Sequence, residues 1–411
     1  MKVWKTAYPW LVVVLLLFVW MLNYLDRQVI FSIFPLLQAE LHISTVQLGL
    51  LGTSFLWVYA FSSPLAGHLA DRFGSKRMIC LSLLVWSLIT LLTGHIRGYR
   101  QLVAMRSLMG ISEACYLPAG LAMIAAYHGT RTRSRAVSLH YSGTYLGTVL
   151  GGTLGGWIGS HQGWRSVFNI LGGVGVLYAL VLMSLLRNPS AETYAEEPPA
   201  RGTGLNESAS VILRTPGYKS LLSVFGIASI CDWAIYTWFP LYLYERFHFS
   251  LAAAGFTATF WIRAGGFLGL LCGGLLADRW ARSSPRGRVW TQTVGLGLAA
   301  PCLIVSSVTG QVTLLCVAML LFGLGKGMYD GNTMPVLCEG IPAGMRATAF
   351  GFLNFAGTIL GGAVALAAGI LKASIGLNGT FLGCGMLMLV AAAITARIRM
   401  RSLSAVNVAR V

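Results

Sequence analysis

The sequence predicts an all-α, polytopic membrane protein of twelve transmembrane helices, arranged as two pseudo-symmetric six-helix bundles. Three observations carry this prediction. Apolar residues make up 56% of the 411 residues and charged residues only 10%, whereas soluble domains contain roughly 25% charged residues. Apolar stretches long enough to cross a hydrocarbon core of roughly 30 Å recur along the chain. Motifs in the first half of the sequence also return in the second half.

The apolar stretches give the positions of the expected spans. The first begins at Tyr8 and resembles a signal peptide, but it runs past Met21 without a small-residue cleavage site, so we interpret it as a helix. One long polar stretch, Arg187 to Lys219, predicts a solvated linker. The expected domains are residues 1–187, a cytoplasmic linker 188–219, and residues 220–411. The expected spans are residues 8–37, 46–70, 78–96, 100–126, 135–158, 165–186, 220–244, 251–277, 288–309, 312–338, 346–370 and 375–397.

The formal net charge of +17 is explained by membrane topology rather than by nucleic-acid binding. Most Lys and Arg residues fall in short clusters in every second segment between the spans, and therefore on one side of the membrane. This bias predicts that both termini are cytoplasmic and that the protein lies in the cell inner membrane. The eight cysteines are scattered singly in apolar segments without metal-ligand spacing. We therefore expect no metal, no cofactor and no nucleic-acid partner. No nucleophile–base constellation stands out, so an enzyme is not predicted.

The two halves share motifs at nearly constant spacing. Gly67-His-Leu-Ala-Asp71-Arg72 ends the second span, and Gly274-Leu-Leu-Ala-Asp278-Arg279 ends the eighth, 207 residues later. Gly147-Thr-Val-Leu-Gly-Gly152 likewise returns 210 residues later as Gly357-Thr-Ile-Leu-Gly-Gly362. Such a duplication, with a binding site where the repeats meet, is typical of secondary transporters.

The stretch from Gly67 through Asp71-Arg72 to Lys76-Arg77 resembles the signature loop between helices 2 and 3 of the major facilitator superfamily. Within that superfamily, Asn23-Tyr-Leu-Asp26-Arg27 and Arg106-Ser-Leu-Met-Gly-Ile-Ser-Glu113-Ala are similar to the anion:cation symporters. That family moves sugar acids and other organic anions, usually with protons. Spinster-like lipid carriers share both elements, and Glu113-Ala-Cys-Tyr116 favours them. The resemblance covers the whole chain.

Charged side chains inside the expected spans mark candidate functional positions, because a charge at bilayer depth costs at least about 2.5–3.5 kcal/mol. Arg106 and Glu113 are two helical turns apart on one face, about 10 Å along the axis. They are too distant to neutralise each other, so each needs a partner on another helix or on a ligand. The intramembrane set is Asp26, Arg27, Arg106, Glu113, Asp232, Arg263, Lys326 and Asp330, with His140 as a member that can be neutral.

We assign these residues to substrate binding and proton coupling. Arginine forks suit a carboxylate, and buried carboxylates suit proton uptake and release. The resemblance adds a substrate-holding tyrosine, Tyr59, although the glutamine that usually follows it is Ser63 here. The expected substrate-binding residues are Arg27, Tyr59, Arg106, Tyr236, Lys326 and Asn354. The expected proton-coupling residues are Asp26, Glu113, Asp232 and Asp330.

Structural alternatives remain open for both halves. The first-half charges also fit a static ion-pair network that joins helices 1 and 4. Lys326 and Asp330 are four residues apart and can pair with each other, and the aromatic side chains of helices 7 and 10 can simply pack. The resemblance implies a separate role for four loop residues, which would latch the cytoplasmic side shut: Asp71, Arg72, Asp278 and Arg279.

The leading hypothesis is a monomeric, proton-coupled symporter of a small organic anion, such as a sugar acid, working by alternating access in the bilayer. The alternative is a Spinster-like transporter of an amphiphilic lipid such as a lysophospholipid. A membrane receptor or scaffold is disfavoured, because it has no use for so many buried charges.

Overall fold

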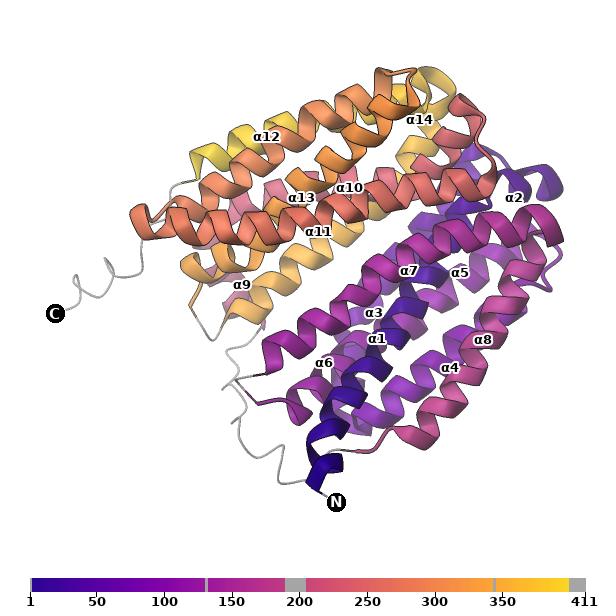
Figure 1. The fold of residues 1–411 in the computed structure, drawn as a ribbon, viewed down its shortest axis with the longest axis horizontal. Coiled ribbons are helices and arrows are strands. Elements are labelled where there is room, and N and C mark those ends of the chain that lie inside the picture. Colours follow the sequence, from indigo (N-terminus) through magenta and orange to yellow (C-terminus); the bar gives the residue numbers. More distant parts are fainter. Residues whose placement is uncertain (1, 130–131, 189–204, 343–344, 399–411) are drawn as a thin grey trace. The chain divides into compact units, whose positions relative to one another are not determined.

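The computed structural model describes residues 2–129, 132–188, 205–342 and 345–398, and within these ranges every regular element is an α-helix (Figure 1). The first eight helices are α1 (Lys2–Ser32), α2 (Phe34–Leu41), α3 (Thr45–Phe73), α4 (Ser75–Thr93), α5 (Tyr99–Ala114), α6 (Tyr116–Tyr127), α7 (Arg133–Gln162) and α8 (Trp164–Leu185). The remaining helices are α9 (Leu205–Arg214), α10 (Tyr218–Phe247), α11 (Leu251–Ser283), α12 (Gly287–Val308), α13 (Val312–Gly340) and α14 (Arg346–Arg397).

Ten helical segments of the described chain are long and apolar enough to cross a membrane. The helices α5 and α6 form one of them, Tyr99–Tyr127, and α14 is another. Because Gly376 has a φ of 67°, it breaks the 52-residue α14 into two rods. The helix α7 is 30 residues long but rich in glycine and polar residues, so it falls outside the ten. Counting α7 and both rods of α14 gives twelve spans, which confirms the predicted fold class.

The structure departs from the expected boundaries at two places for a clear physical reason. The first span ends at Ser32 rather than at residue 37, because Pro35 cannot continue the hydrogen-bond ladder and instead starts the short helix α2. The expected solvated linker contains the helix α9. Ile212 of α9 is fully buried and packs with Tyr218 and Val289 in a hydrophobic cluster. Burial of this face explains why a segment that is polar in composition becomes helical.

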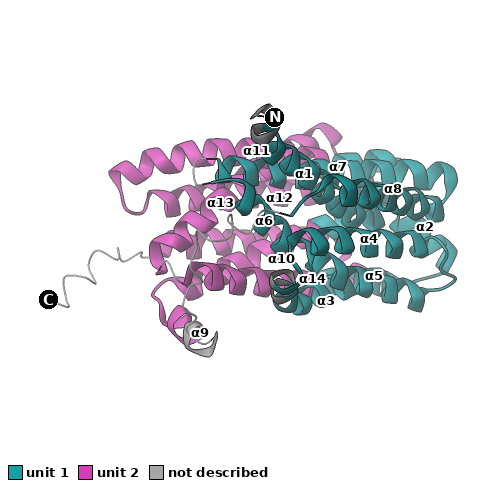
Figure 2. Ribbon diagram, turned by 90° about the horizontal axis from the view of Figure 1, so that it is seen from below, with its two compact units in different colours: residues 1–198, 236–259, 365–369 teal, residues 199–235, 260–364, 370–411 magenta. Residues whose placement is uncertain are grey.

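The chain forms two compact units, which Figure 2 shows in different colours. Unit 1 comprises residues 1–198, 236–259 and 365–369, and unit 2 comprises residues 199–235, 260–364 and 370–411. The helices α10, α11 and α14 therefore contribute to both units. Unit 1 contains all of α1–α8, and unit 2 contains all of α9, α12 and α13.

Glycines of α7 set the position of α1 within unit 1. A Cβ atom added at Gly143 would lie 2.7 Å from the carbonyl oxygen of Leu17, and one added at Gly151 would lie 2.5 Å from that of Leu25. Only glycine permits such a close approach of two helix backbones. The contact holds the part of α1 that carries Asp26 and Arg27.

In both halves of the chain, an arginine at the start of a helix donates hydrogen bonds to main-chain carbonyls that precede it. Arg133, at the start of α7, donates from Nε to His128 O (3.3 Å) and from Nη2 to Ala125 O (3.4 Å). Arg346, at the start of α14, donates from Nε to Ile341 O (3.1 Å) and from Nη2 to Cys338 O (2.9 Å). Both arginines bond carbonyls five and eight residues earlier, which satisfies the end of the preceding helix. The internal repeat is therefore visible in three dimensions.

Candidate functional site

The centre of the candidate site is an ion pair between α1 and α5. Arg27 Nε lies 2.6 Å from Glu113 Oε2, and the two side chains are 5% and 0% exposed. Aromatic rings surround the guanidinium: its Cζ lies 4.6 Å from the ring centroid of Tyr59, 5.0 Å from Phe55 and 5.2 Å from Tyr24. Such rings stabilise a cation that has little contact with water. Glu113 thus has a partner on another helix, Arg27, as the sequence predicted. Tyr59 lies beside Arg27.

Arg106 places a second buried guanidinium beside the Phe55 ring that also contacts Arg27. Its Cζ lies 4.7 Å from the centroid of Phe55 and 6.0 Å from that of Phe31, and the residue is 2% exposed. Its Nη1 contacts the Met109 sulfur at 3.4 Å, a weak acceptor. Among the described residues, neither Arg106 Nε nor Arg27 Nη2 has a hydrogen-bond acceptor. Two fixed positive groups therefore retain donors that an anion can occupy.

Buried acceptors without partners lie on the same helices. Asp26 is 4% exposed and Glu113 is fully buried, and Asp26 Oδ1 and Glu113 Oε1 accept no hydrogen bond from the described residues. The amides of Asn23 and Gln28 on α1 are also buried and unsatisfied there. Each such group costs about 1–3 kcal/mol unless water, a proton or a ligand satisfies it. This density of unsatisfied polar atoms in one unit is typical of a binding site.

Tyr236 of α10 belongs to unit 1 and lies beside this cluster. Its ring packs edge-on against Phe31, with 5.6 Å between centroids, and its hydroxyl donates to Tyr24 O at 3.5 Å. Phe31 in turn borders Arg106. The structure therefore brings six of the predicted site residues together in one unit: Asp26, Arg27, Tyr59, Arg106, Glu113 and Tyr236.

A second charged cluster lies in unit 2. Lys326 Nζ contacts Asp330 Oδ1 at 2.6 Å, Asp330 Oδ2 at 2.7 Å and Asp232 Oδ2 at 2.8 Å. The lysine side chain is 8% exposed, whereas the two aspartates are 44% and 47% exposed. An ammonium group has three donors, so these contacts occupy all of them. The self-pairing of Lys326 with Asp330 thus occurs, and Asp232 joins it from α10, which sequence spacing alone did not indicate.

Other predicted residues lie on α14, α11 and α7. Asn354 is exposed on α14 of unit 2, and Arg263 is half-buried on α11. His140 of α7 is fully buried, and its Nε2 lies 3.0 Å from the Tyr116 hydroxyl. Trp20 stacks on both of these rings. His140 is therefore part of an aromatic core in unit 1.

The expected latch residues are seen in part. The side chain of Asp71 lies outside the part of the chain whose side chains the structure describes. Arg72 and Arg279 are exposed at the ends of α3 and α11. Asp278 Oδ1 lies 3.6 Å from Arg288 Nη2, and Arg288 Nη1 lies 2.5 Å from Glu339 Oε1. Arg288 thus joins α11, α12 and α13 within unit 2. Sequence reasoning missed Arg288 and Glu339, although a basic residue beginning one helix and an acidic residue ending another were visible signals.

The comparisons with known proteins identify the family of the chain. The family model of the Major Facilitator Superfamily matches residues 16–366. The chain belongs to the Major Facilitator Superfamily. The resemblance seen in the Gly67–Arg77 stretch is thereby confirmed, and this major facilitator protein is a multi-pass membrane transporter rather than an enzyme.

Relatives of both expected kinds are similar to this major facilitator protein. The probable galactarate/D-glucarate transporter GudP of Bacillus subtilis is 29% identical over 84% of this chain and 83% of its own. The probable galactarate/D-glucarate transporter GarP of Escherichia coli K12 is 27% identical over 92% of each. Protein spinster homolog 1 of Xenopus laevis is 26% identical over 78% of this chain and 64% of its own.

A solved structure shares the fold. It is described as a bacterial homologue to the human lysosomal transporter Spinster, in an inward-facing and unoccupied conformation. The TM-score is 0.83 with 21% sequence identity, and the match covers 94% of this chain and 96% of the other. At this identity the likeness establishes the fold.

Proposed function

We propose that this protein is a secondary active transporter that moves a small organic anion, such as a sugar acid, together with a proton by alternating access. The observation that carries the proposal is the pair of buried arginines, Arg27 and Arg106, which both contact the Phe55 ring and have donors that no acceptor among the described residues occupies. A guanidinium presents two parallel N–H groups that match a carboxylate. The names of the relatives GudP and GarP indicate the same substrate class.

Charge balance provides a reason for coupling to a proton. With all four groups ionised, Asp26, Arg27, Arg106 and Glu113 have a net charge of zero. A bound monoanion alone would add an uncompensated negative charge to this buried site, which is costly in a low dielectric. Taking up one proton with the anion restores neutrality. The loaded and empty sites then carry the same net charge, which favours the movement of substrate and proton as a unit.

Glu113 is the carboxylate best placed to take up that proton. It accepts a hydrogen bond from Arg27 Nε, so substrate and Glu113 compete for the same guanidinium. Protonation of Glu113 removes its charge and weakens this pair. Arg27 then becomes available to the substrate carboxylate. Asp26 is the second candidate, since it is also buried and has an unsatisfied oxygen.

The proposal includes a location and a set of partners. The alternation of Lys and Arg clusters along the chain supports both termini in the cytoplasm and a place in the cell inner membrane. The partners are the organic anion, the co-transported proton and the bilayer, and the protein works as a monomer.

Uptake into proteoliposomes tests this function. Purified protein is reconstituted, an inwardly directed proton gradient is imposed, and radiolabelled D-galactonate, a monoanion at neutral pH, is measured inside the vesicles. We expect accumulation that a protonophore abolishes and that other sugar acids inhibit. Absence of both accumulation and competition across a panel of sugar acids would contradict the proposal.

The second candidate is a Spinster-like carrier of an amphiphilic lipid such as a lysophospholipid. The run Glu113-Ala-Cys-Tyr116 and the similarity to protein spinster homolog 1 of Xenopus laevis favour it. Ligand-dependent thermal stability distinguishes the two, because only a ligand that binds the folded state raises its stability. Stabilisation by a lysophospholipid but by no sugar acid would favour the lipid carrier.

A further inference from the structure

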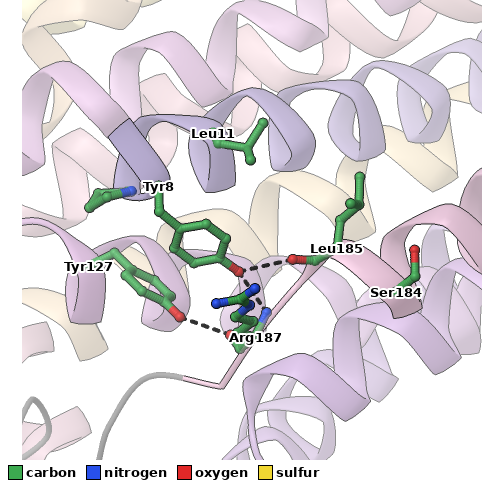
Figure 3. Close-up of a pocket in the computed structure, with 7 residues that line it drawn as sticks. Tyr8, Leu11, Tyr127, Ser184, Leu185 and Arg187 are labelled. Atoms are coloured by element: carbon green, nitrogen blue, oxygen red, sulfur yellow. Dashed lines mark hydrogen bonds between the residues drawn. The ribbon is translucent and has the colours of Figure 1, made fainter. Parts of the chain in front are cut away.

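A pocket lies at the end of unit 1 that carries the N-terminus (Figure 3). None of the residues that line it belongs to the candidate transport site. Its volume is about 380 Å³, within the range of small-ligand pockets. The lining comes from the start of α1, the end of α6 and the end of α8: Tyr8, Pro9, Leu11, Tyr127, Ser184, Leu185 and Arg187. Leu11 and Arg27 are sixteen residues apart on α1, about 24 Å along the helix. This pocket, here called the Arg187 pocket, is therefore distinct from the arginine cluster.

Two tyrosines hold the main chain of Arg187 in place. The Tyr8 hydroxyl accepts from Arg187 N at 2.7 Å and donates to Leu185 O at 3.1 Å, while the Tyr127 hydroxyl donates to Arg187 O at 3.0 Å. The two rings meet edge to face, with 5.5 Å between centroids. These bonds, drawn as dashed lines in Figure 3, satisfy main-chain groups of Leu185 and Arg187 at and just beyond the end of α8. The position of Arg187 is thus built by three helices.

Among the described residues, no acidic side chain pairs with the guanidinium of Arg187. Its Cζ lies 5.6 Å from the Tyr8 ring centroid, but within the described residues no hydrogen bond or ion pair engages its N–H groups. The side chain is exposed, and the lining contains no acidic residue. Because arginine stays protonated and offers five donors, the pocket presents a positive charge that no acidic residue of its lining balances.

The walls that lead away from this charge are apolar. On α1, Leu11, Val14 and Phe18 are 38–43% exposed and share one helical face. On α8, Val181 and Leu185 are 47% and 43% exposed at a spacing of four. The two helices touch farther along, where Tyr178 donates to Leu15 O at 2.7 Å. An apolar track therefore runs from the charged pocket along α1 and α8.

We propose that the Arg187 pocket binds the phosphate headgroup of an anionic phospholipid, with the acyl chains lying along α1 and α8. The guanidinium fork matches phosphate oxygens, and basic pockets at helix ends attract anionic headgroups. Tyrosines at this level suit the polar–apolar boundary of a bilayer. A water-soluble anion would contact only the guanidinium, whereas a diacyl lipid would contact both the guanidinium and the apolar track. This inference does not depend on which substrate the protein transports.

Native mass spectrometry of the delipidated, full-length protein tests the proposal. Phosphatidylglycerol and phosphatidylcholine with identical acyl chains are titrated separately. We expect tighter binding of phosphatidylglycerol to the natural protein and a loss of about five-fold in Arg187→Gln, since one basic residue near an anionic lipid contributes roughly that factor. The variant keeps the bonds to Tyr8 and Tyr127, because these use main-chain atoms. Arg100→Gln removes an equally exposed charge elsewhere and should behave like the natural protein.

Three results would overturn the proposal. The first is that Arg187→Gln retains the full preference for phosphatidylglycerol. The second is that the natural protein binds both lipids equally. The third is that sn-glycerol 3-phosphate, which has the phosphate without acyl chains, displaces phosphatidylglycerol at equal concentration. That last result would identify a site for soluble phosphate compounds instead of a lipid site.

Discussion

Arg27 on α1 donates from Nε to Glu113 Oε2 on α5 across 2.6 Å, and both side chains are almost completely shielded from water. Removing one member of a buried pair leaves the other uncompensated, which typically costs about 3–5 kcal/mol. The pair is therefore stable only as long as both charges are present. A proton on Glu113, or an anion that replaces it, changes that balance.

Glu113→Gln imitates the permanently protonated carboxyl. We expect gradient-driven accumulation to disappear, because no proton can be released, while exchange of substrate for substrate persists. Proteoliposome uptake with and without a pH gradient measures both activities. Glu40→Gln removes an exposed carboxylate elsewhere and serves as the control. If Glu113→Gln and Asp26→Asn each still concentrate substrate to the natural ratio, the proton is carried by another group, with Asp232 or Asp330 next to be tested.

Arg106→Lys keeps the positive charge but loses the planar fork and its stacking on Phe55. Losing one charge-assisted hydrogen bond costs about 1.5–3 kcal/mol, so we expect the apparent affinity for substrate to fall by roughly ten-fold or more. The concentration dependence of uptake measures it. Arg100→Lys, at an exposed position, should leave affinity unchanged. Full affinity in Arg106→Lys would remove this residue from the substrate site.

In unit 2, Asp330 makes two of the three contacts to buried Lys326 and Asp232 makes one. Asp330→Asn should therefore lower the thermal unfolding midpoint more than Asp232→Asn. Because both carboxylates are nearly half exposed, water offsets part of the loss, and we expect about 1–2 kcal/mol for Asp330→Asn. Thermal unfolding in detergent compares the two variants with the natural protein. Equal effects would mean that the two carboxylates stabilise the ammonium to the same degree.

Arg288 joins three helix ends in unit 2 through Glu339 at 2.5 Å and Asp278 at 3.6 Å. Partly exposed pairs contribute only about 1 kcal/mol or less, yet this suffices to shift an equilibrium between two nearly equal conformations. We expect Glu339→Gln to slow transport turnover more than Asp278→Asn, with substrate affinity unchanged in both. Initial uptake rates at saturating substrate give turnover, and equilibrium binding gives affinity. A change of affinity without a change of rate would contradict a gating role.

The pair between Glu40 and Arg165 makes stability depend on pH. The hydrogen bond from Arg165 lowers the pKa of the Glu40 carboxyl below its ordinary value, and Trp164 Nε1 donates to the same carboxylate at 2.7 Å. The sign follows: the stabilisation is complete above the ordinary pKa of about 4.3 and is lost as the pH falls through the lowered value. Both side chains are well exposed, so the effect is below about 1 kcal/mol. Unfolding midpoints between pH 6 and pH 3 should fall less steeply in Glu40→Gln than in the natural protein.

Several residues of the site could be predicted from the sequence, because a charged residue within an apolar run is expected to be buried in the membrane. Asp26, Arg27, Arg106 and Glu113 stand out in apolar runs, and a bilayer tolerates such residues only for a reason. Their pairing was not accessible. The separation of seven residues between Arg106 and Glu113 excluded a direct pair, but it did not identify Arg27 as the partner of Glu113.

The Arg187 pocket was also invisible in the sequence. Arg187 reads there as the first residue of a polar linker. Its position depends on Tyr8 and Tyr127, which are far from it in the sequence. Their hydroxyls form hydrogen bonds with its main chain in the folded protein. The amphipathic helix α9 is a similar case, because the burial of Ile212 needs the cluster around Val289.

The sequence by itself determined the number of spans, the duplication and the identity of the intramembrane charges. A lipid environment forces every backbone polar group into a helix, so continuous apolar runs leave little choice of local structure. The tertiary structure decided which charges meet. Helical periodicity gives the face on which a side chain lies but not the rotation of one helix against another. That rotation is set by close backbone contacts such as Gly143 against Leu17. Only this packing brings Arg27 to Glu113 and Asp232 to Lys326.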